Sequence, residues 1–172
     1  MAAEGNVTVA TVLVVDGCRT RCRTVAMRLQ TAGVTVSIAF DFATAQECIA
    51  TGPPHAAIIG DGVAERLRVE LARMLRAARP RARLVFVTAF PNAFRCLQAC
   101  QADAAFVCTS HDPAALVPYL LGRADALSLV MEPRLQSIRQ LAAADAREIA
   151  GTVTRAAALL GVSRKTLRSY LG

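Results

Sequence analysis

The first 125 residues alternate between short apolar runs and segments with helical spacing, and this alternation limits the fold more than any other feature of the chain. The apolar runs, mostly rich in β-branched residues, cover 7–15, 34–40, 56–59, 84–88 and 104–108. Helical spacing follows each run, over 25–32, 43–49, 64–78, 92–101 and 113–121. Glycine and proline breakers separate the segments. Five such units with apolar strands predict an α/β fold, a doubly wound five-stranded parallel sheet of flavodoxin-like architecture.

Several residues stand where the expected strands end, and a parallel sheet gathers such residues at one edge. They are Asp16 and Gly17 after the first strand, Gly60 and Asp61 after the third, Thr88 and Ala89 at the fourth, and Phe106, Thr109 and Ser110 in and after the fifth. Over about residues 10–122 this arrangement resembles the receiver domain of bacterial response regulators. The resemblance puts Gly60 where the phosphorylated aspartate belongs, Thr109 in place of a lysine and Ser110 in place of a proline. It also makes Phe106 the aromatic residue that changes rotamer on activation, the alternative being a fixed core ring.

These departures have a chemical meaning. Phosphoryl transfer to aspartate needs a nucleophilic carboxylate, a magnesium ion held by clustered carboxylates, and a cation near the phosphate. Asp16 is the one certain acid, and the only lysine of the chain is Lys165. Asp61 lies one residue beyond the acceptor position, so strand alternation predicts that it points to the opposite face, unless a loop distortion returns it. The sequence therefore predicts a pseudoreceiver with no metal, no cofactor and no catalytic residue.

The last 22 residues read GTVTRAAALLGVSRKTLRSYLG and contain two short helical patterns around a glycine. Thr152 or Thr154 is placed to cap the first helix, and Gly161 to make the turn. Ala156, Ala157, Leu159 and Leu160 form its expected packing face. Ser163 is placed to cap the second helix, where Leu167 and Leu171 are expected on one buried side.

This segment resembles the Fis-type helix-turn-helix, also found in RegA/PrrA-type response regulators. The matching residues are Gly151, Thr154, Ala156, Ala157, Leu160, Gly161, Val162, Arg164, Thr166, Leu167 and Leu171. The resemblance implies that Arg164, Thr166 and Arg168 contact bases or phosphates, that Thr154, Arg155, Ser163 and Lys165 contact the backbone of double-stranded DNA, and that Ser169 completes the set. Thr152 replaces the usual asparagine, and Ser169-Tyr170 replaces more basic residues, so the resemblance implies weaker binding.

Charge supports the same interpretation. Residues 134–172 hold seven basic and two acidic side chains, which makes +5 of the chain's net charge of +7. A basic face on this segment is typical of a polyanion binder. We expect a receiver-like domain over 8–124, a linker over 125–133 and a small all-α helix-turn-helix domain over 134–172. A helix over 134–144 should pack on the helix-turn-helix, and Fis-type units imply a homodimer.

The remaining composition narrows the function. No apolar run approaches the roughly 20 residues of a membrane span, and no signal peptide is recognisable, so we expect a cytoplasmic protein. The six cysteines form no C-x-x-C pair, which leaves small hydrophobes as the default and a thiol redox sensor as the alternative.

The sequence favours a DNA-binding transcriptional regulator that is not controlled by aspartyl phosphorylation. A regulatory partner protein, a small ligand in the vacated pocket, or thiol oxidation would then supply the signal. The alternative is an adaptor or antagonist that dimerises with a full response regulator without reading DNA. An enzyme is not expected, because no catalytic set of carboxylates or of Ser, His and Asp is recognisable.

Overall fold

The apolar runs form one parallel sheet, as predicted. The structure, a computed structural model, describes residues 10–108, 112–123 and 135–172. Its strands are β1 (Thr11–Val15), β2 (Thr35–Ala39), β3 (Ala56–Ile59), β4 (Arg83–Thr88) and β5 (Ala105–Cys108), in the order β2-β1-β3-β4-β5. Every neighbouring pair is parallel, so the carboxyl ends of the strands meet at one edge. The first residues of the predicted run 7–15 lie outside the described residues.

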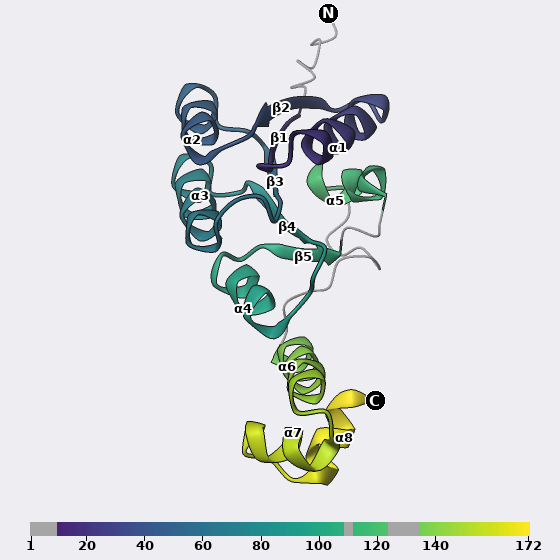
Figure 1. Ribbon diagram of the computed structural model, residues 1–172. Coiled ribbons are helices and arrows are strands. Elements are labelled where there is room, and N and C mark those ends of the chain that lie inside the picture. Colours follow the sequence, from purple (N-terminus) through teal and green to yellow (C-terminus); the bar gives the residue numbers. More distant parts are fainter. Residues whose placement is uncertain (1–9, 109–111, 124–134) are drawn as a thin grey trace, which may run out of the picture.

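Helices cover both faces of the sheet (Figure 1). One face carries α2 (Phe42–Thr51), α3 (Glu65–Ala78) and α4 (Ala93–Gln101), and the other carries α1 (Arg19–Thr31) and α5 (Val117–Leu120), which follows the 3-10 turn η1 (Pro113–Leu116). The predicted helix over 113–121 is divided because Pro118 has no N–H to continue the hydrogen bonding of the preceding turn.

Alternation along the strands produces two apolar cores. Leu13 and Val15 of β1 belong to the core beneath α2, α3 and α4, whereas Val12 and Val14 belong to the core beneath α1 and α5. All four side chains are at most 2% exposed. The sheet is thus buried on both faces, which explains why its strands are continuous apolar runs. We call residues 10–123 the α/β domain.

The C-terminal unit consists of α6 (Leu135–Ala150), α7 (Val153–Leu160) and α8 (Arg164–Leu171), which lie beyond α4 in Figure 1. Its own core is Ala143, Ala146, Ala156, Ala157 and Leu167. Small side chains at these contacts let the helices cross closely. No helix among those described is both long and apolar enough to cross a membrane.

Helix α6 packs on α7 and α8 as predicted, but it is longer than predicted and uses other residues for that contact. It continues six residues beyond the predicted end at Ala144, and Ile138 and Leu141 pack against the α/β core instead of the helix-turn-helix. The residues that contact α7 and α8 are Ala143 and Ala146, on another face of the same helix. A single helix therefore has two apolar faces and joins the two parts of the chain. The predicted linker 125–133 lies outside the described residues.

Candidate functional site

Asp16 and Arg21 form an ion pair at the carboxyl edge of the sheet. Arg21 donates from Nε to Asp16 Oδ2 at 2.6 Å and from Nη2 to Asp16 Oδ1 at 3.0 Å, and the Cys18 N–H donates to Oδ1 at 2.8 Å. Asp16 is 3% exposed. Because Asp16 accepts these hydrogen bonds, it raises the pKa of the Arg21 guanidinium. Asp16 is the one certain acid of the pocket that the sequence predicts, and both of its oxygens are paired with Arg21.

Asp61 points into the same region, contrary to the strand-alternation prediction. Its Oδ2 accepts from Thr88 Oγ1 at 2.8 Å and from the Ala89 N–H at 2.8 Å. Its Oδ1 accepts from Arg68 Nη1 at 3.2 Å and from Arg95 Nη1 at 3.1 Å. The prediction was wrong because β3 ends at Ile59, so the pleat no longer governs position 61 and the alternative of a loop distortion holds.

Two glycines make this distortion possible. A Cβ at Gly60 would overlap the Asp16 carboxylate and lie only 2.8 Å from its Cγ. A Cβ at Gly62 would lie 2.9 Å from the Cα of Gly17. The chain on both sides of Asp61 therefore packs directly against the residues that follow β1. Position 60, where the resemblance puts the acceptor, has no room for a side chain.

Two of the donors around Asp61 are arginines that the sequence analysis missed, the buried Arg68 and the half-buried Arg95. Arg68 of α3 is 1% exposed, and its Nε also donates to the Val63 carbonyl at 3.2 Å. Burial lowers the pKa of its guanidinium, although an arginine remains charged. Arg95 of α4 also donates to Thr88 Oγ1 at 2.6 Å. No sequence signal distinguished Arg68 and Arg95, because 19 of the 20 basic residues are arginine.

The carboxylates do not fit a magnesium ion. Both oxygens of Asp16 and Oδ1 of Asp61 already accept from guanidinium groups, and Asp61 Oδ2 accepts from the Thr88 hydroxyl and the Ala89 N–H. A hard cation needs free oxygen ligands, and here arginines hold the positions around them. Within the part of the chain that the structure describes, no three His, Cys, Asp or Glu residues are grouped as metal ligands.

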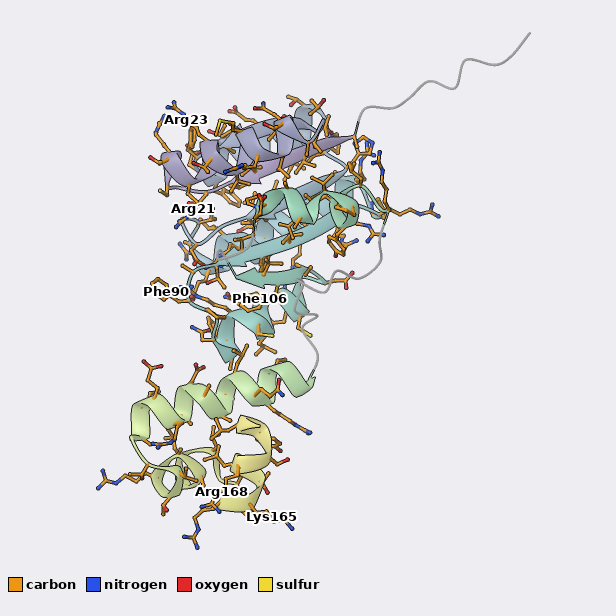
Figure 2. The ribbon with its side chains drawn as sticks, turned by 90° about the vertical axis from the view of Figure 1, so that its right-hand side faces the viewer. Arg21, Arg23, Phe90, Phe106, Lys165 and Arg168 are labelled. Atoms are coloured by element: carbon orange, nitrogen blue, oxygen red, sulfur yellow. The ribbon has the colours of Figure 1, made fainter. Side chains whose placement is uncertain are left out.

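The other predicted pocket residues have separate positions. Phe106 is 1% exposed and lies in the α/β core, paired in register with Phe86. Thr109 and Ser110 lie outside the described residues. A cavity of about 250 Å³ lies between α1 and the turn before α5, with Asp16 and Arg21 at its polar end and Val25, Ile58 and Leu116 among its apolar walls. Figure 2 shows Arg21 and Phe90 on the side where the strands end.

Two of the described cysteines are buried thiols. Cys22 is 0% exposed, its Sγ lies 3.5 Å from the Val14 carbonyl oxygen, and burial raises its pKa to about 11. Burial also raises the pKa of Cys96. Both side chains stay protonated at neutral pH, and a thiol that is not ionised reacts slowly with oxidants. The exposed cysteines are Cys18 and Cys100.

In the C-terminal unit, a tight turn joins α7 to α8. Thr152 rather than Thr154 caps α7, accepting from the Arg155 N–H at 3.3 Å. Gly161 has φ 65° and ψ 29°, and the Val162 N–H reaches the Ala157 carbonyl at 3.0 Å. This is the Schellman ending that favours glycine at its left-handed position. Ser163 caps α8 by accepting from the Thr166 N–H at 3.0 Å, as predicted.

The predicted DNA-contacting residues gather on the outside of this unit. The exposed members of the set are Thr154, Arg155, Ser163, Arg164, Lys165, Arg168 and Ser169, whereas Thr166 is half-buried. Figure 2 shows Lys165 and Arg168 pointing away from the α/β domain. Leu167 is 0% exposed as predicted, but Leu159 and Leu171 are 59% and 39% exposed. Those two predictions were wrong because the unit's small core is filled by alanines and Leu167.

Known structures resemble this chain in fold. No family model matches the sequence, and neither does any curated protein. A response regulator from Burkholderia pseudomallei, solved with a phosphorylated aspartic acid, a calcium ion and citrate, is 18% identical with a TM-score of 0.62 over 95% of this chain and 99% of that one. A CheY-like receiver domain protein from Methanospirillum hungatei is 18% identical, with a TM-score of 0.59 over 69% of this chain and 95% of that one. A two-component response regulator from Clostridium difficile is 16% identical, with a TM-score of 0.58 over 68% and 99%.

These similarities show that the α/β domain has the receiver fold. The five-stranded parallel sheet with helices on both faces agrees with this assignment. The shared fold leaves the chemistry to be argued from the residues, because one fold hosts many functions.

Proposed function

We propose that this chain is a DNA-binding transcriptional regulator of the response-regulator type, whose α/β domain is not controlled by aspartyl phosphorylation. The observation that carries the proposal is the surface of α8, where Arg164, Lys165 and Arg168 are exposed side by side on a helix that begins at a tight turn. None of the three pairs with a carboxylate of the described residues. Unpaired cations on one helix provide the counterion release that drives binding to DNA.

The arrangement of α7 and α8 suits insertion into the major groove. Leu167 anchors α8 from the inside, and the cap at Ser163 leaves the first turn of α8 facing outward. In helix-turn-helix proteins the first residues of the second helix contact base edges. Arg164 and Arg168 are one turn apart, so both would reach the same groove, with Arg155 and Lys165 on the phosphates.

Independence from phosphorylation rests on the state of the two carboxylates. Asp16 is held by Arg21, and Asp61 accepts four hydrogen bonds. A nucleophile needs a free lone pair and a neighbouring metal to bring the phosphoryl donor close. Neither carboxylate meets these conditions.

A homodimer would give the DNA-binding unit its second half-site. The surface that supports one is apolar and lies on and before α4, where Phe90, Phe94 and Leu97 are 74%, 56% and 42% exposed. Large exposed apolar side chains grouped in this way are typical of protein contacts. The same surface would serve a regulatory partner protein if the chain does not pair with itself.

The test is selection of DNA from a genomic library at two salt concentrations. The intact chain is compared with Arg164→Ala/Arg168→Ala and with the matched double variant Arg23→Ala/Arg28→Ala, which removes the same charge from exposed positions on α1. We expect the intact chain and the α1 variant to enrich one two-fold symmetric sequence, and the α8 variant to lose it. Each lost phosphate contact should also reduce the slope of log K against log salt by about 0.9.

The adaptor or antagonist alternative is favoured by a different observation. Ile149 and Leu159 of the C-terminal unit are 78% and 59% exposed, and apolar side chains suit a protein partner better than a phosphate backbone. If no sequence is enriched, or if both double variants weaken binding equally, the DNA-reading proposal fails. Capture of a complete response regulator by the intact chain would then support the alternative.

Phosphorylation has its own test. Incubation with acetyl phosphate and magnesium should leave the mass of the intact chain unchanged. A gain of one phosphoryl group that disappears in Asp61→Asn would contradict the proposal, because Asp61 would then be a working acceptor.

A further inference from the structure

The Asp61 carboxylate lies in a cradle made by three elements. The cradle consists of Thr88 and Ala89 at the end of β4, Arg68 of α3 and Arg95 of α4. It offers one hydroxyl, one backbone N–H and two guanidinium groups, all between 2.8 and 3.2 Å from the two oxygens of Asp61. The Asp61 side chain itself is only 13% exposed.

The charges show why the cradle needs an anion. Arg68 is almost fully buried, and Arg95 has a side chain that is 19% exposed. The only other described carboxylate near them is Glu65, whose Oε1 lies 3.7 Å from Arg95 Nε. Without the Asp61 carboxylate, two guanidinium groups would face each other across a site lined by two further donors. Such a set of donors has the chemistry that binds carboxylate or phosphate.

The first turn of α4, which carries Arg95, also contacts the C-terminal unit. Arg95 is the third residue of α4, and its N–H donates to the capping Asn92 Oδ1 at 2.9 Å. The N–H of Ala93, the first residue of α4, donates to Asp145 Oδ2 of α6 at 3.1 Å. The first turn of α4 is therefore fixed by Asp61 from within the α/β domain and by Asp145 from α6.

Helix α6 extends this connection to the rest of the C-terminal unit. Ile138 and Leu141 pack on the α/β core, and Ala143 and Ala146 pack on α7 and α8. A displacement of the first turn of α4 would disturb the hydrogen bond to Asp145 and the packing of α6 together. Packed helices of this kind respond as a unit because their contacts do not deform gradually.

We propose that the cradle is a binding site for a small oxyanion that the chain fills with its own Asp61, and that this tethered anion fixes α4 in the position on which the C-terminal unit docks. The wild-type protein then has no vacant site, so free phosphate or acetate does not compete. Removal of the carboxylate opens the site to either anion. This inference does not depend on DNA binding.

The test uses the full chain with Asp61→Ala and, as a matched control, Glu70→Ala, which removes the same charge from an exposed position on α3. Thermal unfolding is measured with inorganic phosphate, with acetate, and with chloride at the same ionic strength. We expect Asp61→Ala to have a lowered Tm that saturating phosphate or acetate raises by about 5–10 °C at a hundredfold excess over Kd. The wild type and Glu70→Ala should respond to the three salts equally.

Amide hydrogen exchange tests the connection to α6. In chloride, the amides of the first turn of α4 and those of α6 should exchange at least tenfold faster in Asp61→Ala than in Glu70→Ala, and phosphate should restore them. An equal response of Asp61→Ala and wild type to phosphate would overturn the oxyanion site. A phosphate-dependent rise in Tm with unchanged exchange in α6 would overturn the link to the C-terminal unit.

A second variant covers the case in which Asp61→Ala does not fold in chloride. Asp61→Asn keeps the size of the side chain, so it fills the site and leaves no room for an added anion. We expect Asp61→Asn to fold and to show no specific response to phosphate, and Asp61→Ala to become soluble when it is refolded in phosphate. If phosphate does not recover Asp61→Ala while Asp61→Asn folds, the proposal is wrong.

Discussion

In the α/β domain, Arg21 and Arg68 are paired with the carboxylates of Asp16 and Asp61, whose side chains are 5% and 13% exposed, whereas Arg164 and Arg168 of the C-terminal unit are exposed and pair with no described carboxylate. Both parts of the chain thus use arginine side chains, but the surroundings of these side chains differ. A buried guanidinium with its partner contributes to specifying the fold, because removal of either member leaves an uncompensated charge. An exposed guanidinium contributes little to stability and remains available for an anionic ligand.

Within the α/β domain, the apolar cores and the polar residues at the carboxyl edge of the sheet make separate contributions. Gly60 stands where the resemblance places the acceptor, and the Asp16 carboxylate packs against it. Arginines donate hydrogen bonds to the carboxylates of both Asp16 and Asp61. The strands themselves are held by apolar packing in two cores to which these polar residues do not belong.

The largest expected effect is that of Arg68→Ala on the α/β domain. The substitution leaves Asp61 buried with one guanidinium instead of two and removes the bond to the Val63 carbonyl. We expect the free energy of unfolding to fall by about 3–5 kcal/mol, as for other broken buried ion pairs. Urea unfolding followed by circular dichroism measures it.

The control for Arg68→Ala is Arg73→Ala on the same helix, where the arginine is exposed. Its effect should stay within about 0.5 kcal/mol. If the free energy of unfolding falls equally in Arg68→Ala and Arg73→Ala, the pairing of Arg68 with Asp61 does not stabilise the α/β domain.

The second prediction concerns the small core of the C-terminal unit. Leu167 is 0% exposed and is the one large side chain among the fully buried residues of this core, the others being alanines. We expect Leu167→Ala to cost about 2–5 kcal/mol of local stability, because the alanines buried beside it are too small to fill the cavity that it leaves. Hydrogen exchange should show loss of protection in α7 and α8, with the strands unchanged.

Leu159→Ala is the matched variant, since Leu159 is 59% exposed on α7. It should leave the exchange of α7 and α8 amides nearly unchanged. If the strand amides of Leu167→Ala also exchange faster, the α/β domain and the C-terminal unit unfold together. The two parts would then not differ in stability.

The third prediction tests whether receiver chemistry can be restored by one residue. Gly60→Asp puts a carboxylate where the resemblance places the acceptor, but its Cβ would overlap Asp16. We expect a loss of about 1–3 kcal/mol from overpacking and no phosphorylation by acetyl phosphate. Gly52→Asp is the control, because nothing lies within 4 Å of a Cβ at Gly52 and its φ of −163° suits any residue. A stable, phosphorylated Gly60→Asp would contradict our account of this edge of the sheet.

The sequence predicted the sheet and its helices well because their signals are local. Each strand is an apolar run between breakers, and β3 was predicted with the bounds that the structure gives. The cap at Ser163 and the turn at Gly161 were also predicted correctly, since hydroxyl side chains prefer the start of a helix and glycine prefers its end.

The polar contacts at the carboxyl edge of the sheet could not be predicted from the sequence. Alternation along a strand gave the wrong direction for Asp61 because the strand had already ended. Arg95 reaches Asp61 across 34 positions in the sequence, and nothing in a chain with so many arginines identifies it. The double packing of α6 was missed for a similar reason: a helical pattern shows that apolar faces exist but not what each face contacts.

The smallest expected effect is a pH dependence confined to the α/β domain. His55 precedes β3, and its Nδ1 accepts from the Thr11 N–H at 3.2 Å, which ties the beginnings of β1 and β3 together. Burial lowers the pKa of His55 below its usual value of 6.5. The unfolded chain therefore takes up this proton first, so the stability that His55 contributes is complete above pH 6.5 and is lost as the pH falls below it. The loss should not exceed about 0.5–1.5 kcal/mol, the value of one neutral hydrogen bond.

Urea unfolding at pH 7.5 and 5.5 measures this loss, and His55→Asn is the control because its side-chain oxygen can accept the same hydrogen bond without titrating. We expect the wild type to lose more stability than His55→Asn between the two pH values. The C-terminal unit contains no histidine, so exchange in α7 and α8 should show no corresponding change. An equal loss in both proteins would mean that protonation of His55 does not weaken the junction of β1 and β3, and that the pH response arises from groups common to both.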